Sequence, residues 1–368
     1  MGQKKPIKIY QGLQPFAFLF RIGVSVRNYL FDKGVLHSRT FPVPVICVGN
    51  ITVGGTGKTP HTEYLIRLLK DQYQVAVLSR GYKRKSKGFV LAKPGTPMPE
   101  IGDEPYQMAH KFPYIYMAVD RDRCHGIGKL TDGQTTPGVG VIILDDAYQH
   151  RYVKAGRTIL LIDYNRPIWQ DCMLPAGRLR EPQQGKRRAD IIIVSKCPPY
   201  LSREEQKELR RNISPSSHQQ LYFTTLSYGK LQPLFVNEAE RALDSLLADE
   251  HILLVTGIAS PAAIISRLKE HTAHIGTLTF ADHHDFSEAD LQRIEKEFDA
   301  LPPKKLIITT EKDAARLLNH PAVSGKLKPY IYVLPVSVEF LNKEEQMFNQ
   351  NIIEYVRENS RDSSLPEG

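Results

Sequence analysis

The sequence predicts an α/β fold, with a mostly parallel β-sheet covered by helices on both faces and a smaller C-terminal α/β unit. Short, apolar, β-branched runs recur along the chain and alternate with segments of helical pattern, which is typical of sheets buried on both faces. The sequence pattern changes after about residue 198, where polar and turn-rich segments replace the apolar runs, and a second set of strands and helices begins at residue 251. A length of 368 residues also suits about two domains of roughly 150 residues.

The larger unit is expected to begin after an N-terminal amphipathic helix over residues 15–31, in which Pro15 suits a first helical position. Residues 42–50 form the first expected strand, and 60–71 the helix that follows it. Further strands are expected over 74–79, 114–119, 139–146, 158–163 and 189–196.

A polar helix over 202–212, a turn-rich stretch and extended segments over 219–234 lead into the second unit. Its expected strands are 251–259, 274–280, 305–313 and 330–336, with helices from Pro261 and near 287–299. We therefore divide the chain into an N-terminal membrane-contact segment (1–40), a core domain (41–218) and a smaller C-terminal domain (219–368).

Composition excludes several classes of protein. The chain is 41% hydrophobic but has no apolar run of about 18–20 residues, so neither a transmembrane helix nor a disordered chain is predicted. The four cysteines are far apart and form no CxxC pair, which suits reduced thiols in the cytosol and argues against a disulfide framework or structural zinc. No cleavage signal follows the basic N-terminus, so no secretory signal is expected.

The formal net charge of +9 is concentrated near the N-terminus, where residues 1–40 hold seven basic side chains and one acidic one. Together with the aromatic-rich helix over 15–31, this basic segment suggests contact with an anionic membrane surface. The pattern alone equally allows a helix whose apolar face packs on the domain core.

The strongest motif is residues 48–60 (VGNITVGGTGKTP), where a strand, a glycine-rich turn and a helix follow one another. Glycines in such a phosphate-binding loop let backbone N–H groups surround phosphate oxygens, with the helix N-terminus behind them. Lys58 would reach the β- and γ-phosphates of ATP, and the Thr59 hydroxyl would bind Mg²⁺. Thr52 holds the place of the usual first glycine. The expected nucleotide-binding residues are Thr52, Val53, Gly54, Gly55, Thr56, Gly57, Lys58 and Thr59.

Carboxylates follow two further elements. Asp145 and Asp146 end the strand over 139–146, and because ligands bind at the carboxyl ends of parallel strands, they should face Thr59 and bind Mg²⁺. Asp103 and Glu104 precede Pro105, where they could simply cap a helix. Residues 280–286 (FADHHDF) offer a histidine beside carboxylates, which suits a general base or a surface loop but lacks the HxxxH spacing of metal ligands.

Seven short motifs in register resemble the tetraacyldisaccharide 4′-kinase (lipid A 4′-kinase) family. They are residues 48–60, 79–82 (SRGY), 102–105 (GDEP), 145–150 (DDAYQH), 174–181 (LPAGRLRE), 280–283 (FADH) and 310–313 (TEKD). The resemblance spans roughly residues 13–320 and implies a P-loop kinase-like fold. It also implies Mg²⁺-dependent transfer of the γ-phosphate of ATP to the 4′-hydroxyl of a tetraacylated glucosamine disaccharide 1-phosphate, a lipid A precursor, giving lipid IVA.

The resemblance further implies the roles of individual residues. Asp103 and His283 become the expected catalytic pair beside Lys58, although His284 doubles the histidine, and Asp103 would accept the proton of the sugar hydroxyl. Expected metal ligands are Thr59, Glu104, Asp145 and Asp146, and expected substrate contacts are Arg80, Tyr82, Gln149, His150 and Arg178. Lys83-Arg84 and Ala147-Tyr148 depart from the family's usual glycines and Gly-Leu.

The family would also place the protein peripherally on the cytoplasmic face of the inner membrane of a Gram-negative bacterium. One alternative is a soluble P-loop small-molecule kinase, whose N-terminal helix would be part of the core. Another is a nucleic-acid-binding NTPase switch, but no nucleic-acid-binding signature is visible and the loop lacks the extra early lysine of such switches. We expect no nucleic acid and no obligate protein partner.

Overall fold

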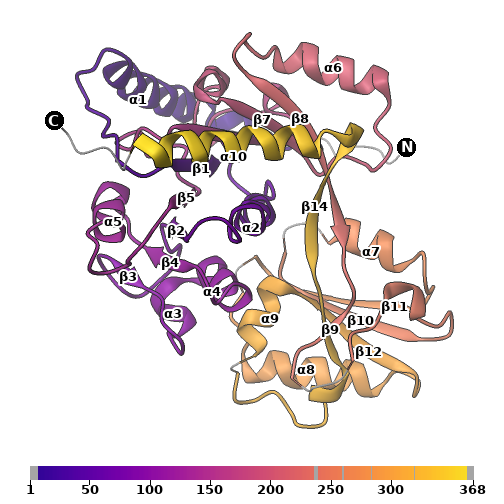
Figure 1. Cartoon of the computed structure of the whole chain (residues 1–368). Helices are drawn as coiled ribbons and strands as arrows, with labels where there is room; N and C mark the ends of the chain where they lie inside the picture. The colour runs from indigo at the N-terminus through magenta and orange to yellow at the C-terminus, as the bar shows by residue number, and fades with distance from the viewer. Residues whose placement is uncertain (1–6, 236–238, 259–260, 283, 319, 363–368) are drawn as a thin grey trace.

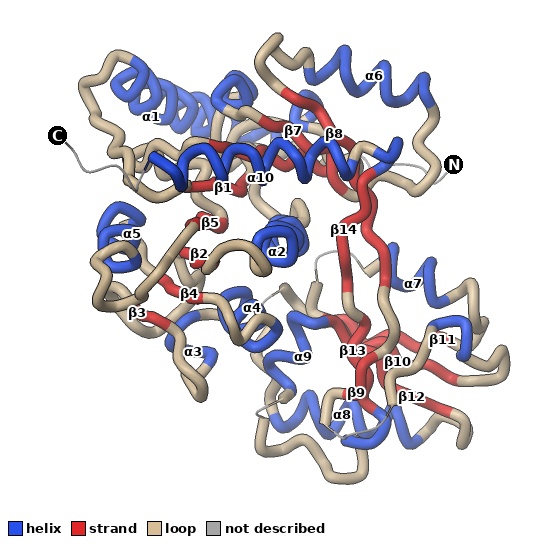
Figure 2. Tube along the Cα trace, viewed as in Figure 1, coloured by secondary structure: helices blue, strands red, loops and turns tan. Residues whose placement is uncertain are grey.

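The computed structural model describes residues 7–235, 239–258, 261–282, 284–318 and 320–362. They form two sheets, one of nine strands in the order β14-β8-β7-β6-β1-β5-β2-β4-β3 and one of five in the order β11-β10-β12-β13-β9. Helices lie against both sheets (Figures 1 and 2). The predicted α/β class, with a large and mostly parallel sheet and a smaller second one, is confirmed.

The nine-stranded sheet is parallel across its centre, and its two edge strands, β3 and β14, run antiparallel to their neighbours. Its central strands are buried along their whole length, as their apolar sequences require. The strands are β1 (Val45–Gly49), β2 (Val75–Ser79), β3 (Val90–Leu91), β4 (Tyr116–Val119), β5 (Val141–Asp145), β6 (Arg157–Asp163), β7 (Ile191–Ser195), β8 (Gln220–Tyr228) and β14 (Val336–Phe340).

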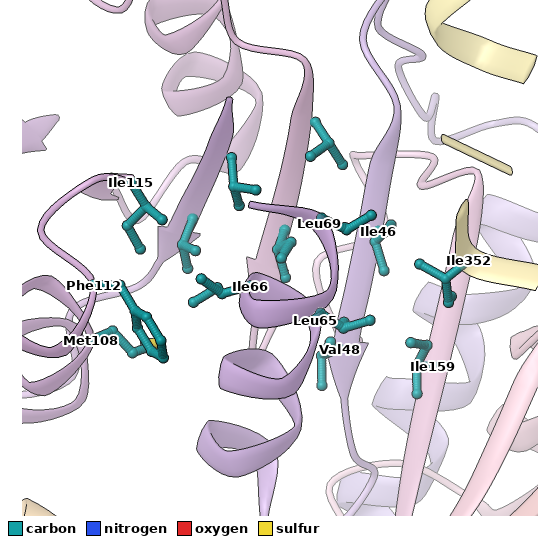
Figure 3. Packing of buried hydrophobic residues seen from close by; sticks show 14 of the residues in the cluster. Ile46, Val48, Leu65, Ile66, Leu69, Met108, Phe112, Ile115, Ile159 and Ile352 are labelled. Atoms are coloured by element: carbon teal, nitrogen blue, oxygen red, sulfur yellow. The ribbon is translucent and has the colours of Figure 1, made fainter. Parts of the chain in front are cut away.

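Helices cover both faces of this sheet because alternate residues of each strand point to opposite sides. Ile46 of β1 packs with Ile66 of α2 and Met108 of α4 on one face (Figure 3), while Cys47 packs with Ile127 of α5 on the other. The helices around this sheet are α1 (Gln14–Asp32), α2 (Lys58–Leu69), α3 (Met98–Ile101), α4 (Asp103–Lys111), α5 (Arg123–Leu130), α6 (Arg203–Ile213) and α10 (Glu345–Asp362).

The five-stranded sheet is parallel except for β9, which pairs antiparallel with β13. One face packs against α8 and α9 through Phe298 and Leu317, and the other packs against α7 through Leu268. Its elements are β9 (Gln232–Pro233), β10 (His251–Thr256), α7 (Ala262–Leu268), β11 (Ile275–Thr279), α8 (Glu288–Asp299), β12 (Lys305–Thr310), α9 (Glu311–Leu317) and β13 (Ile331–Leu334).

The chain passes between the two sheets along an antiparallel ribbon of β8 and β14, which pair from Thr224↔Phe340 to Tyr228↔Val336 (Figure 1). After β14 the chain returns to the larger sheet, where Ile352 and Tyr355 of α10 join the core around Ile46. The Tyr355 hydroxyl donates to the Val45 carbonyl and accepts from its N–H, each at 3.1 Å. Segments after residue 219 therefore belong to both sheets, and the division at 218/219 stays a proposal.

The N-terminal helix α1 packs on the larger unit along a narrow stripe. Only Ala17 and Phe31 of its residues are buried, whereas Phe16, Phe18 and Leu19 are each more than 60% exposed. The bulky apolar face expected from the sequence thus points mainly away from the core. Within the described residues, no helix combines the length and the apolar character needed to cross a membrane.

Candidate active site

The glycine-rich loop over residues 50–57 joins the end of β1 to the first turn of α2. Gly54 and Gly57 adopt φ values of +110° and +84°, which favour glycine, and Gly57 is the residue that caps α2. The loop is fixed from both ends: the Asn50 side-chain amide donates to Thr56 Oγ1 (2.7 Å), and Ser195 Oγ donates to the Thr56 carbonyl (2.8 Å). A glycine-rich turn held in this way before a helix N-terminus is suited to binding phosphate.

Residues 178–180 run beside residues 51–53 and hold the first half of the loop. Val53 N–H donates to the Arg178 carbonyl and Arg180 N–H donates to the Ile51 carbonyl, both at 2.8 Å. Thr52, which stands in the place of the usual first glycine, forms an antiparallel bridge with Leu179. A β-conformation suits threonine, so the structure accounts for this departure from the loop pattern.

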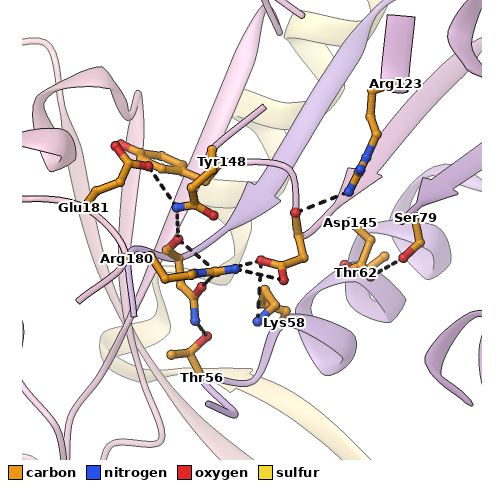
Figure 4. Close-up of polar contacts among 12 residues, drawn as sticks. Thr56, Lys58, Thr62, Ser79, Arg123, Asp145, Tyr148, Arg180 and Glu181 are labelled. Carbon is orange, nitrogen blue, oxygen red and sulfur yellow. Dashed lines mark hydrogen bonds and ion pairs between the residues drawn. The ribbon is translucent and has the colours of Figure 1, made fainter. Parts of the chain in front are cut away.

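The side chain of Lys58 lies close to Asp146, the second of the two aspartates at the end of β5. Its Nζ lies 3.7 Å from Asp146 Oδ1, and the guanidinium of Arg180 binds both oxygens of Asp146, at 2.8 and 3.2 Å (Figure 4). Burial alone would raise the pKa of Asp146, but the positive charges of Lys58, Arg180 and Arg123 outweigh burial and lower it to about 2. Asp146 is therefore ionised and poised at the mouth of the loop.

Asp145, the last residue of β5, is completely buried. It accepts hydrogen bonds from Ser79 Oγ (3.2 Å) and Thr62 Oγ1 (3.4 Å) (Figure 4). Burial, followed by the negative charges of Glu104 and Asp146, raises the pKa of Asp145 to about 7. The negative charges of the expected metal ligands Glu104 and Asp146 thus favour the protonated form of Asp145.

These carboxylates do not form a closed cage among the described residues. The one set of three potential ligand atoms within 4.8 Å of one another there is Asp122, Cys124 and His150. Asp122 instead caps α5 and accepts from two backbone N–H groups, and Cys124 donates to the Tyr152 carbonyl. Mg²⁺ is commonly bound by one or two carboxylates together with phosphates and water, so an open set of carboxylates beside a phosphate loop fits it.

Asp103 is the first residue of α4, and the preceding Gly102 has a φ of +89°. The Asp103 carboxylate contacts the guanidinium of Arg316. Arg316 belongs to α9, a helix that packs on the five-stranded sheet. His283, its expected partner, lies outside the described residues. The neighbouring His284 bonds to Asp290 Oδ2 (2.9 Å).

The expected substrate residues lie around the loop without forming one tight cluster. Gln149 donates to the Asn50 carbonyl (2.8 Å) and to Glu181 Oε1 (2.9 Å), so it holds the loop's first residue. Arg80 is exposed just after β2, and Tyr82 is 61% exposed.

His150 is partly buried, and its Nε2 is buried without a hydrogen-bond partner among the described residues. Burial, followed by the charge of Arg123, lowers the pKa of His150 to about 4, so the ring is neutral. Arg178 is exposed at the loop's edge, where its backbone carbonyl bonds to Val53. The structure therefore brings Gln149 and Arg178 to the loop through hydrogen bonds.

The sequence does not single out several residues of this site, among them Asn50, Arg180 and Glu181. Arg180 contacts Asn50 as well as Asp146, and Glu181 pairs with Arg188 at 2.8 Å and accepts from Gln149. The signal was present, since Arg180 and Glu181 end the motif over 174–181 that carried part of the resemblance. Their charge gave no indication that they face the loop rather than solvent.

The departures from the family pattern have local explanations. Lys83 has a φ of +59°, a conformation that favours the glycine usual there, and Arg84 donates to the Val119 and Gly88 carbonyls. Tyr148 is buried with its hydroxyl donating to the Gly185 carbonyl at 2.6 Å. The side chains of Arg84 and Tyr148 therefore take structural positions in this protein.

Comparisons with known proteins agree with this geometry. The model of the family described as tetraacyldisaccharide-1-P 4′-kinase matches residues 9–357. The tetraacyldisaccharide 4′-kinase of Phocaeicola vulgatus is 58% identical over 98% of both chains, and that of Bacteroides fragilis is 54% identical over 99% of this chain and 98% of its own.

Among solved structures, the chain resembles a crystal structure of the "apo" form of LpxK from Aquifex aeolicus in complex with ATP. The TM-score is 0.70 and the sequence identity 31%, over 94% of this chain and 98% of that one. The similarity thus covers both sheets and the ribbon between them, and it confirms the predicted kinase fold. The chain belongs to the tetraacyldisaccharide-1-P 4′-kinase family.

Proposed function

We propose that this protein transfers the γ-phosphoryl group of ATP to the 4′-hydroxyl of a tetraacylated glucosamine disaccharide 1-phosphate, giving lipid IVA. Family membership supports the reaction, since the relatives are named for it. The observation that carries the proposal is the placement of Lys58 3.7 Å from Asp146 at the mouth of the glycine-rich loop. A cation and strand-end carboxylates facing one another are what phosphoryl transfer from a metal-bound nucleotide requires.

ATP would bind along residues 52–59, with backbone N–H groups of the loop and the N-terminus of α2 facing its phosphates. The related LpxK structure in complex with ATP supports this assignment. Lys58 would exchange its pairing with Asp146 for the β- and γ-phosphates, leaving Asp146 bound by Arg180. Hydrogen bonds to Asn50 and His61 hold Thr56 and Gly57 of the loop in place.

Thr59, Asp145 and Asp146, together with Glu104 of α4, whose charge acts on Asp145, would hold Mg²⁺. The donor set is hydroxyl and carboxylate oxygen, which this ion prefers. When bound, the ion neutralises charge on the phosphate oxygens of the transferring group. Ser79 and Thr62 orient Asp145 by donating to its two oxygens.

Asp103 would accept the proton of the sugar hydroxyl, with His283 as the group that orients it and balances its charge. The position of Asp103 at the N-terminus of α4 favours its ionised form. Arg316, which contacts Asp103, does the same and ties the residue to the smaller sheet. Arg80, Tyr82, Gln149, His150 and Arg178 remain proposed contacts of the acceptor.

The acceptor carries four acyl chains, so the enzyme must meet it at a membrane surface. Helix α1 presents Phe16, Phe18 and Leu19 outward, and basic side chains such as Arg21 and Lys33 lie on the same segment. An exposed apolar face with basic residues beside it favours an anionic bilayer surface. We therefore place the protein peripherally on the cytoplasmic face of the inner membrane of a Gram-negative cell.

The test is transfer of ³²P from γ-labelled ATP to purified tetraacyldisaccharide 1-phosphate in detergent, with folded Lys58→Ala as the control. We expect a labelled lipid whose label is lost when the 4′-phosphate is removed. Activity on a deacylated, water-soluble disaccharide equal to that on the lipid would favour a soluble small-molecule kinase instead. Absence of transfer, with ATP hydrolysis stimulated by DNA or RNA, would favour the nucleic-acid-dependent switch.

A further inference from the structure

Two arginine side chains lie against Gly54 of the phosphate loop. A Cβ built on Gly54 would lie 3.6 Å from Arg166 Nη1 and 3.8 Å from Arg178 Nη1, so both guanidinium groups border the backbone there. The segment that follows β6 supplies Arg166, and the segment beside residues 51–53 supplies Arg178. The resemblance implies that Arg178 contacts the acceptor, whereas no sequence motif contains Arg166.

The segment that carries Arg166 is tied to the loop itself. Arg166 N–H donates to the Asp163 carbonyl at 2.9 Å, and the Asp163 carboxylate pairs with Lys196 Nζ at 3.0 Å. The same ammonium group of Lys196 donates to the Gly55 carbonyl. One ion pair thus anchors both the arginine's backbone and the neighbouring residue of the loop, which fixes their relative position.

Neither guanidinium group has a hydrogen bond or an ion pair with any side chain in the part of the chain that the structure describes. The nearby carboxylates are committed elsewhere: Asp163 to Lys196, and Asp171 to the backbone N–H groups of Cys172 (2.8 Å) and Arg178 (3.0 Å). Two like charges are therefore held close together at a loop shaped for phosphate. Burial, followed by the charge of Arg178, lowers the pKa of Arg166. An anion placed between the two would relieve this repulsion.

We propose that the Arg166 guanidinium, with Arg178 beside it, binds oxygens of the terminal phosphate of ATP and stabilises the phosphoryl group during transfer. The inference rests on the proposed function. In that step the bond from the γ-phosphorus to the β–γ bridging oxygen breaks, and ADP leaves. A bond to the acceptor oxygen forms, and the hydroxyl proton goes to Asp103. Arg166 forms no covalent bond; it offers a planar fork of donors that matches phosphate oxygens.

The placement of Arg166 accounts for the absence of a second lysine from the early part of the loop. In phosphate-loop GTPases an arginine of the same chain or of another protein supplies an extra cation to the transferring phosphate. The switches considered above carry an early lysine in the loop itself. Here Val53 occupies that part of the loop and is 44% exposed, so no lysine supplies the charge. A guanidinium group beside Gly54 would supply it from within the same chain. A stabilising arginine of this kind contributes roughly 10³–10⁵-fold to turnover in related reactions.

The first test measures nucleotide binding without turnover. Calorimetric titration of Arg166→Ala with ADP and with the non-hydrolysable analogue AMP-PNP, each with Mg²⁺, separates the terminal phosphate from the rest of the nucleotide. We expect AMP-PNP affinity to fall at least about tenfold while ADP affinity changes less than about twofold. Arg211→Ala, which removes an exposed arginine at the C-terminal end of α6, is the matched control and should change neither.

The second test measures turnover on the lipid. Arg166→Ala should lower kcat by at least about 10²-fold, and Arg166→Lys should recover part of it, because the charge returns without the fork. Arg178→Ala should have a smaller effect, since its side chain is more exposed. Thermal unfolding of each variant close to that of the wild type shows that the loop is intact.

Two outcomes would overturn the proposal. Equal losses of ADP and AMP-PNP affinity would show that the Arg166 guanidinium binds the inner phosphates or only maintains the conformation of the loop. Unchanged nucleotide affinities, with weaker binding only of acceptors that retain the 1-phosphate, would place it at the acceptor. Both differ from failure of the proposed function, in which the wild-type protein itself would not phosphorylate the lipid.

Discussion

The guanidinium group of Arg316 contacts the carboxylate of Asp103, and this contact joins the two α/β units of the chain. Arg316 belongs to α9 beside the five-stranded sheet, and its side chain is 2% exposed; Asp103 begins α4 beside the nine-stranded sheet. Arg316 Nη1 also lies 3.6 Å from the fully buried Asp313. The proposed proton acceptor is thus held by a buried cation of the other unit.

Replacing Arg316 with Ala should destabilise the protein by about 3–5 kcal/mol, because it leaves the buried Asp313 carboxylate without its cation. The measurement is urea-induced unfolding at pH 7. Arg267→Ala is the matched control: it breaks the exposed pair between Arg267 of α7 and Glu270, which follows the helix, and should cost less than about 1 kcal/mol. Equal losses for the two variants would show that Arg316 does not stabilise the buried Asp313 carboxylate.

Replacing Lys58 with Ala should lower kcat by at least about 10³-fold, because no other loop side chain offers a charge to the β- and γ-phosphates. Stability should change little, since Asp146 keeps its two bonds to Arg180. Steady-state kinetics and thermal unfolding check both statements. Lys70→Ala, beside the exposed Asp71 at the end of α2, should leave kcat unchanged. A folded Lys58→Ala enzyme of near-normal activity would exclude the loop as the nucleotide site.

Sequence patterns predicted the central strands well because these strands are buried on both faces and read as continuous apolar runs. The strand expected over 139–146 is β5 (Val141–Asp145), and the helix expected over 60–71 is α2 (Lys58–Leu69), which starts earlier because Gly57 caps it. The sequence predicts one strand over residues 330–336. These residues instead contribute to two strands, β13 and β14, which separate at Pro335 and join different sheets.

Long-range pairing could not be predicted from the sequence. The antiparallel pairing of β8 and β14 joins residues more than a hundred positions apart. Nothing in the local sequence of residues 336–340 selects β8 as the neighbouring strand. The sequence patterns do not predict helix α10, although its Ile352 is completely buried in the core of the larger unit. The same distinction holds at the site. The glycine-rich loop and Asp145 belong to local sequence motifs and can be predicted, whereas folding brings Arg166, Arg180 and Arg316 to the site from distant parts of the chain.

Replacing Phe16, Phe18 and Leu19 together with Ser should weaken binding to vesicles that contain anionic lipid at least about tenfold, because these side chains are exposed on α1. Co-sedimentation with vesicles measures it. The KM for the lipid should rise while the KM for ATP stays constant. Tyr200→Ser with Met347→Ser removes exposed apolar side chains from elsewhere and is the control. Unchanged vesicle binding by the triple variant would show that the membrane contact lies elsewhere.

His61 should make the protein less stable in acid. Burial, followed by the charge of Lys196, lowers the pKa of His61 to about 4, although its hydrogen bond to the Gly57 carbonyl opposes this. The unfolded chain binds the proton near pH 6.5, so stability is full above that pH and is lost as pH falls towards 4. Between pH 7.5 and 5 we expect a loss of roughly 2 kcal/mol in urea unfolding that is absent in His61→Gln. Parallel pH profiles for the two proteins would contradict this assignment.

Asp103 and His283 should behave as one unit in transfer to the lipid, while His284 should be dispensable. His284 bonds to Asp290 at the start of α8 and stacks on Phe280 at a ring separation of 4.9 Å, so its imidazole is engaged within the smaller unit. His283→Ala and Asp103→Ala should each lower kcat by at least about 10²-fold with little change in nucleotide affinity, since neither belongs to the phosphate loop. The double variant should be hardly slower than the worse single one, because residues that act as a unit are strongly non-additive. His284→Ala should retain most of kcat and lose some stability. A multiplicative double-variant loss would separate the two residues, and a large kcat loss in His284→Ala with an active His283→Ala would move the imidazole by one position.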